Sequence, residues 1–182
     1  MSPALRRLTL ATHLTFSVGW VGAVIGYLAL DLTVATSGDP LVLRAAWISM
    51  GLVVAWTIVP LAIAALLTGL VMALGTRWGL FRHWWVLISF VLTVVATLVL
   101  LSEAQVIGHI AAIAADPTTS DDELRGLPST LPHSIGGLVL LLTVQVLNVY
   151  KPQGMTRYGW RKRREERNAL QRSDEDQNAD GE

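Results

Sequence analysis

Residues 45–74 read AAWISMGLVVAWTIVPLAIAALLTGLVMAL and contain no Asp, Glu, Lys or Arg. An α-helix rises about 1.5 Å per residue, so roughly 20 such residues cross the ~30 Å hydrocarbon core of a bilayer. Lipid cannot satisfy free backbone polar groups, and an apolar stretch of this length is therefore expected to be a membrane-spanning helix. Pro60 lies near its middle and removes one backbone hydrogen bond, which predicts a kink or a tilt.

Three more stretches have the same character. Residues 8–30, 84–102 and 131–150 contain no formally charged side chain, and each is about long enough to cross a bilayer. The helix of residues 84–102 should continue to about residue 115, because the first strong helix breaker beyond it is Pro117. The sequence therefore predicts an all-α, polytopic membrane protein, with four transmembrane helices in an up-down bundle.

The overall composition agrees with lipid as the solvent. Apolar residues make up 52% of the chain and charged residues 15%, whereas a soluble domain carries about a quarter charged residues. The chain has no cysteine, which excludes disulfides, thiol catalysis and cysteine-bound metals. It also has no Gly-x-Ser-x-Gly, His-Glu-x-x-His or phosphate-loop motif, so soluble catalysis is not expected. Whether the protein is an enzyme stays open, and a non-enzymatic role is preferred.

The charged residues are sorted between the connections, and this sorting predicts the orientation. Three segments are basic: they contain Arg6 and Arg7, then Arg77 and Arg82, then Lys151 and the arginines and lysine of residues 157–164. The other two connections contain Arg44 and Arg125 among seven acidic residues, which are Asp31, Asp39, Glu103, Asp116, Asp121, Asp122 and Glu123. Because Lys and Arg in short loops stay in the cytoplasm, both termini are predicted to be cytoplasmic in a bacterial plasma membrane.

A cleaved signal peptide is the alternative for the first span. Its apolar run, residues 8–30, is longer than the roughly 7 to 15 residues usual in a signal peptide. Four retained spans are the preferred interpretation.

Two regions are expected, a membrane domain of residues 1–160 and a charged cytoplasmic tail of residues 161–182. The tail is basic at first and then acidic, a composition typical of largely disordered chains. Its basic part either acts only as a topology determinant or also binds anionic lipid headgroups, at about 1 kcal/mol per cation. A membrane protein or a second copy of the chain is a candidate partner, and nucleic acid is not expected.

Polar side chains within the spans are predicted to face the bundle interior, because their exposure to lipid costs free energy. They follow one stripe on the first span and a broader face on the last, and they include His13, Ser17, Tyr27, Asp31, Gln145 and Asn148. On the opposite side of the first span, Gly22 and Gly26 form a Gly-x-x-x-Gly pair, which predicts close approach of another helix.

His13 is the deepest ionisable group, about 7 Å into the inner leaflet by the helical rise. One interpretation is a hydrogen bond to Gln145 or Asn148 of the last span. A second is ligation of a metal, or of haem b, for which the candidate histidines pair by leaflet: His13 with His83, and His109 with His133. A third is a proton, ion or quinone site formed by His13, Tyr27 and Asp31.

Residues 5–160 resemble a family of uncharacterised four-helix integral membrane proteins of actinobacteria. The motifs that carry the resemblance are His13-Leu14 with Ser17-Val18-Gly19-Trp20-Val21-Gly22, residues 78–87 (WGLFRHWWVL) and residues 150–159 (YKPQGMTRYG). More remotely, His13 followed by Gly-Trp-x-Gly, and a third span that opens with Trp-x-x-Leu, resemble copper-resistance membrane proteins and four-helix b-type cytochromes. The remote resemblance implies that His13 is a metal or haem ligand.

Three function classes follow from these features. The first is a non-enzymatic membrane protein that acts as a structural, partner-binding or transport-associated subunit. The second is a haem-linked or quinone-linked membrane redox protein. The third is a metal or ion permease centred on His13.

Overall fold

The computed structural model describes residues 2–75, 79–152 and 154–179, so Arg77 and Trp78 of the sequence argument lie outside the described residues. Its elements in chain order are α1 (Pro3–Thr36), α2 (Pro40–Val53), the π-helix η1 (Val54–Ile58), α3 (Val59–Gly75), α4 (Trp84–Ala115), α5 (Asp121–Arg125), α6 (Leu131–Tyr150) and α7 (Arg157–Ala179). Over these residues the predicted all-helical class is confirmed.

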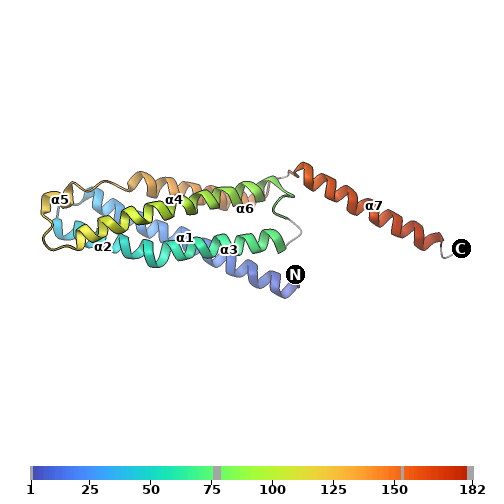
Figure 1. The fold of residues 1–182 in the computed structure, drawn as a ribbon, viewed down its shortest axis with the longest axis horizontal. Coiled ribbons are helices and arrows are strands. Elements are labelled where there is room, and N and C mark those ends of the chain that lie inside the picture. Colours follow the sequence, from blue (N-terminus) through green and yellow to red (C-terminus); the bar gives the residue numbers. More distant parts are fainter. Residues whose placement is uncertain (1, 76–78, 153, 180–182) are drawn as a thin grey trace.

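Within the described chain, four helical segments are long and apolar enough to cross a membrane: α1, the continuous segment Pro40–Gly75, α4 and α6. They run up and down beside one another, and the N-terminus lies at the same end of the bundle as the start of α7 (Figure 1). α1 packs against α2, α3 and α6, whereas α4 packs against the other side of α2, α3 and α6. The four segments therefore form a closed ring.

The predicted limits agree with the structure where the sequence holds a breaker. α6 has the predicted limits, and α4 ends at Ala115 as predicted. α1 is longer than predicted, because its start is fixed by a cap: the Ser2 side chain accepts a hydrogen bond from the Leu5 backbone N–H, and Pro3 occupies the first turn. The uncharged run predicts the part of the helix that would lie in lipid, whereas the N-terminal cap determines the residue at which the helix begins.

Pro60 produces a π-helical turn. Proline has no N–H to bond the carbonyl four residues earlier, at Trp56, and its ring crowds that carbonyl. Immediately before it, the Val59 backbone N–H bonds the Val54 carbonyl, five residues back, which widens the helix locally. The irregularity predicted at Pro60 is thus the turn η1, and its two end residues, Val54 and Ile58, point into the bundle core.

α2 and α4 approach each other closely at Gly51. A Cβ placed on Gly51 would lie 2.6 Å from the Cβ of Ala111, a separation that side chains do not tolerate. Gly22 and Gly26 have no neighbouring atom within 4 Å of a built Cβ, so the close contact predicted for that face of α1 is wrong within this chain. The polar stripe of α1 turns inward and leaves Gly22 and Gly26 on the outer surface.

The connections at the α5 end are fastened by arginines. Arg44 of α2 donates to the carbonyls of Ala114 (2.5 Å), Asp116 (2.6 Å) and Thr119 (3.0 Å), and so satisfies the free carbonyl groups at the end of α4. Arg125 donates to the Gly38 carbonyl (3.3 Å) in the connection between α1 and α2. Both basic residues of the otherwise acidic connections therefore have a structural role.

α7 differs from the expectation of a largely disordered tail, because the chain is helical to Ala179. Its first turn is fixed to the connection before α4: the Thr156 backbone N–H bonds the Arg82 carbonyl (3.0 Å), and Arg82 forms an ion pair with Glu166. Figure 1 shows α7 leaving the bundle as a single helix. Helical ion pairs such as Arg161 with Glu165 (4.0 Å) favour this conformation.

Candidate binding cavity

A cavity of about 280 Å³ lies inside the bundle, between α1, η1, α4 and α6. Its floor consists of buried side chains of α1 and η1, including Trp20, Val24 and Ile58. Its rim consists of exposed residues on α4 and α6, including Val95 and Gly136. The mouth therefore faces sideways between α4 and α6, toward the surface that lipid would cover.

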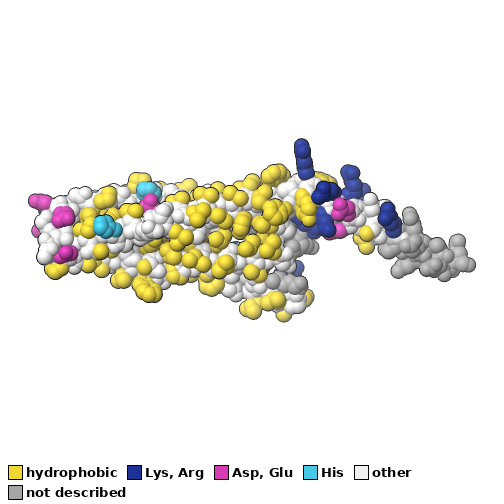
Figure 2. Space-filling view, viewed as in Figure 1, with side chains coloured by type: hydrophobic (Ala, Val, Ile, Leu, Met, Phe, Trp, Pro, Cys, Tyr) yellow, Lys and Arg dark blue, Asp and Glu magenta, His cyan; other side chains and the backbone are white. Residues whose placement is uncertain are grey.

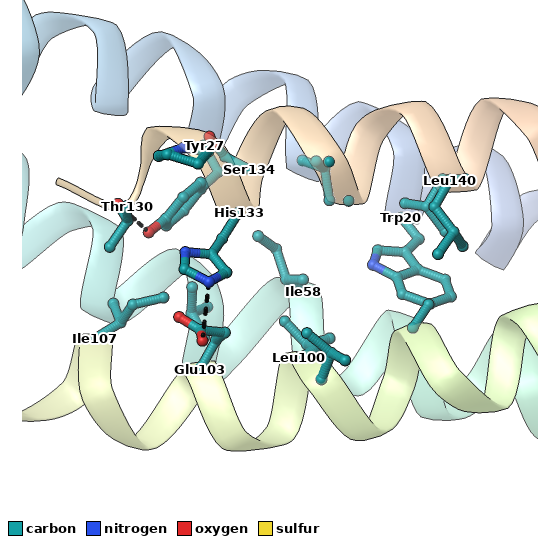
Figure 3. A pocket seen from close by; sticks show the side chains of 18 of the residues that line it. Trp20, Tyr27, Ile58, Leu100, Glu103, Ile107, Thr130, His133, Ser134 and Leu140 are labelled. Atoms are coloured by element: carbon teal, nitrogen blue, oxygen red, sulfur yellow. Dashed lines mark hydrogen bonds and ion pairs between the residues drawn. The ribbon is translucent and has the colours of Figure 1, made fainter.

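Polar groups gather at one end of this cavity. In Figure 3, Tyr27, Thr130, His133 and Glu103 lie at the end nearer α5, and Trp20 and Leu140 lie at the other end. The remaining lining is mainly aliphatic and aromatic. Ligand sites are typically apolar pockets with a few convergent polar groups, which is the arrangement found here.

A buried carboxylate organises one side of the polar end. Asp31 of α1 is 1% exposed and accepts hydrogen bonds from the hydroxyls of Thr130 (2.9 Å) and Ser134 (2.7 Å). The Tyr27 hydroxyl donates to Thr130 Oγ1 (3.2 Å), which extends the chain of hydrogen bonds into the cavity. Asp31 does not line the cavity, but its two donors Thr130 and Ser134 do, and so does Tyr27, which donates to Thr130.

The other side of the polar end is a carboxylate and an imidazole. Glu103 of α4 and His133 of α6 approach to 3.6 Å between Oε1 and Nε2. Their side chains are 25% and 59% exposed, so this pair stands at the mouth of the cavity. The pair bridges the two helices between which the mouth opens.

Sequence reasoning placed Tyr27 and Asp31 in the interior, and the structure buries both. It missed Thr130 and Ser134, which sit four residues apart at the start of α6. The sequence did contain a sign of them. Thr130 and Ser134 are hydroxyl residues at the start of the last span, at the same depth as Asp31, and a buried carboxylate needs hydrogen-bond donors of this kind.

His13 has a different partner from the one predicted. Its Nδ1 lies 3.1 Å from Oγ1 of Thr68 on α3, and not beside Gln145 or Asn148 of α6. The Thr68 hydroxyl also donates to the Ala64 carbonyl (2.7 Å), so His13 Nδ1–H is the donor to Thr68. The reason is packing: this end of α1 lies against α3, where Gly69 leaves room for the imidazole ring, because a Cβ placed on Gly69 would lie only 3.1 Å from Cε1 of His13.

The other predicted polar residues occupy separate places. His83 directly precedes α4, and its backbone bridges to Met155. His109 is exposed on α4, and Ser17, Gln145 and Asn148 are half-buried. Across the part of the chain that the structure describes, no three His, Asp or Glu side chains cluster as a metal site would require.

No protein-family model matches the chain, and no curated protein or solved structure matches it either. The resemblance to uncharacterised actinobacterial membrane proteins and to copper-resistance proteins or b-type cytochromes thus stays a prediction. The fold and the cavity define the class: a helical bundle, apolar enough on its outer surface to cross a membrane, with a lateral pocket that is apolar along its length and polar at one end.

Proposed function

We propose that this protein is a non-enzymatic, multi-pass protein of a bacterial plasma membrane that binds the apolar part of an amphipathic molecule in its lateral cavity. The observation that carries the proposal is the form of the cavity: about 280 Å³, lined mainly by apolar side chains, with its mouth between α4 and α6 and its polar groups at one end. A molecule in the bilayer could enter such a pocket sideways with its polar end at the interface.

The charge distribution supports an orientation with both termini in the cytoplasm. Figure 2 shows Lys and Arg gathered at the end of the bundle where α7 begins, acidic side chains at the opposite end, and a broad apolar band between them. Basic segments remain in the cytoplasm during insertion. With this orientation the polar end of the cavity lies toward the outer leaflet, near the start of α6.

The location of His13 supports a structural role for that residue. It lies on the half of α1 away from the polar end of the cavity, and its ring is held by Thr68 and faces Gly69. A helix-joining hydrogen bond accounts for its burial without a ligand. The proposal therefore places binding at the cavity and not at His13.

The test is to fill the cavity from within and to compare the effect with the same change elsewhere. Gly137 of α6 lines the cavity and has no atom within 4 Å of a built Cβ, so Gly137→Phe should place a ring in the pocket. Gly22→Phe is the matched control, because Gly22 is equally uncrowded and lies outside the lining. Both variants, and the unchanged protein, would be studied in phosphatidylcholine nanodiscs with 1-decanol as ligand.

Binding to the folded state alone stabilises it by about 2.7 kcal/mol when the ligand is at 100 times its Kd. Thermal unfolding, followed by circular dichroism, should shift upward with decanol for the unchanged protein and for Gly22→Phe, and it should not shift for Gly137→Phe. An equal shift in all three proteins would mean that decanol acts through the bilayer, and it would refute binding in the cavity.

A further inference from the structure

We infer that the ligand of the cavity is a single-chain amphiphile whose head group donates hydrogen bonds and carries no negative charge, such as a hydroxyl or amine head. This inference rests on the proposed function and specifies the class of ligand. It follows from the charge and the hydrogen-bond roles of the polar end and from the size of the cavity.

Charge excludes an anionic head group. Glu103 lines the mouth, and the Asp31 carboxylate lies one hydroxyl behind the lining, attached to Thr130 and Ser134. Among the lining residues that the structure describes, His133 is the one side chain able to carry a positive charge. A phosphate or carboxylate head would thus meet two acids in a region of low dielectric, where repulsion between like charges is strong.

The hydrogen-bond roles favour a donor. The hydroxyls of Tyr27, Thr130 and Ser134 already direct their protons along the chain to Asp31. What these groups and Glu103 still offer to the cavity is oxygen lone pairs, because a hydroxyl has one proton and two acceptor sites. A head group with an O–H or N–H would satisfy them, and one with acceptors alone would not.

Size limits the ligand to one chain. A cavity of about 280 Å³ lies at the lower end of ligand pockets, which typically measure about 300 to 1,000 Å³ and hold drug-sized molecules. Tyr27 at the polar end and Trp20 at the apolar end are seven residues apart on α1, about 10 Å along the helix. One chain of about ten carbons fits this length, whereas a two-chain phospholipid does not fit the volume.

The fluorescence of Trp20 reports whether a ligand occupies the cavity. Bromine quenches tryptophan fluorescence on contact, and Trp20 lines the apolar end of the cavity. The ligands are four ten-carbon chains with a terminal bromine that differ only in the head: an alcohol, an amine, a methyl ether with no donor, and a sulfonate that stays anionic. Each is titrated into the full chain in phosphatidylcholine nanodiscs at pH 8. Subtracting the signal of a Trp20→Phe variant removes quenching of the other tryptophans by ligand dissolved in the bilayer.

We expect the alcohol and the amine to quench Trp20 at concentrations at least tenfold lower than the sulfonate, and the ether to be weaker than the alcohol. Glu103→Gln should reduce the difference between the quenching concentrations of the alcohol and the sulfonate, because it removes the negative charge at the mouth. Asp122→Asn is the matched control, because Asp122 is a fully exposed acid of α5 outside the cavity lining. This variant should leave the difference between the two quenching concentrations unchanged.

The outcomes separate this inference from the proposed function. If all four ligands quench Trp20 equally well and Gly137→Phe abolishes the quenching, the cavity binds amphiphiles and the head-group inference is wrong. If no ligand quenches Trp20, or if Gly137→Phe has no effect on the quenching, binding in the cavity itself is refuted.

Discussion

At the scale of single residues, two ionisable side chains within the spans, Asp31 and His13, are held by partners on other helices. Asp31 has two hydroxyl donors, from Thr130 and Ser134, and His13 donates to Thr68. An unpaired polar group in an apolar medium costs several kcal/mol, so each of these contacts restricts how the helices can pack. The residues of the cavity are positioned in this way from α1, α4 and α6.

The His13 contact gives a prediction at this scale. His13→Leu and Thr68→Val should each lower the free energy of unfolding. Their effects should be non-additive by about 0.6 kcal/mol, the average for hydrogen bonds between membrane helices, and by no more than about 1.7 kcal/mol. Reversible unfolding of the two single variants and the double variant in mixed micelles measures this coupling. His13→Gln should retain most of the stability, because an amide can also donate to Thr68.

His109→Leu is the control for this prediction, since His109 is exposed on α4 and should change stability little. Strictly additive effects of His13→Leu and Thr68→Val would show that their contact contributes nothing.

At the scale of elements, small residues and Pro60 decide how the helices meet. The π turn η1 lets the segment Pro40–Gly75 continue through Pro60 without a break, and it places Val54 and Ile58 in the floor of the cavity. π turns are frequent at functional sites because they change which side chains face inward. Trp56, in the same turn, is 79% exposed on the outer surface.

Helix packing gives the element-scale prediction. Gly51→Ala should lower the free energy of unfolding by about 1 to 3 kcal/mol, because its Cβ would overlap Ala111 of α4 and force the helices apart. Gly22→Ala should change it little, since that position has open space around it. Unfolding by denaturant in micelles compares the two. A larger loss for Gly22→Ala would indicate that this face of α1 packs against a second protein.

At the scale of the whole molecule, charge and apolar surface are arranged along one axis. Basic residues lie at the α7 end, acidic residues at the α5 end, and apolar side chains cover the length between them (Figure 2). Arg44 and Arg125, the cations of the acidic end, are occupied with backbone carbonyls. This polarity is the basis for the orientation proposed above.

The orientation can be tested by labelling, because the chain contains no cysteine of its own. A membrane-impermeant maleimide added to intact cells should label Asp122→Cys, which is exposed on α5, and it should label Arg164→Cys only after the membrane is permeabilised. The reverse pattern would place both termini outside. Labelling of both sites in intact cells would contradict a single orientation.

The sequence alone determined the helical segments and their polarity. Uncharged runs of about 20 residues leave the backbone only intrahelical hydrogen bonds in lipid, and Pro117 limits the extension of the third run beyond residue 102. Residues 84–115 and 131–150 could therefore be predicted to within a residue or two. At α7 a tail of charged residues was expected to be largely disordered, and the structure has a helix there to Ala179. Its helix depends on local ion pairs and on the hydrogen bonds of Thr156, which composition does not reveal.

Tertiary structure alone decided the cavity and the partners within it. A helical stripe tells which side of α1 faces inward, but not which neighbour it meets. The hydrogen-bonding interpretation of His13 therefore named Gln145 or Asn148 of α6, whereas His13 bonds Thr68 of α3. The face with Gly22 and Gly26 was likewise assigned a close contact that the structure gives to Gly51. Such pairings depend on how all the helices pack at once. The periodicity of a sequence is a property of each helix by itself, and so it does not specify which residues of different helices meet.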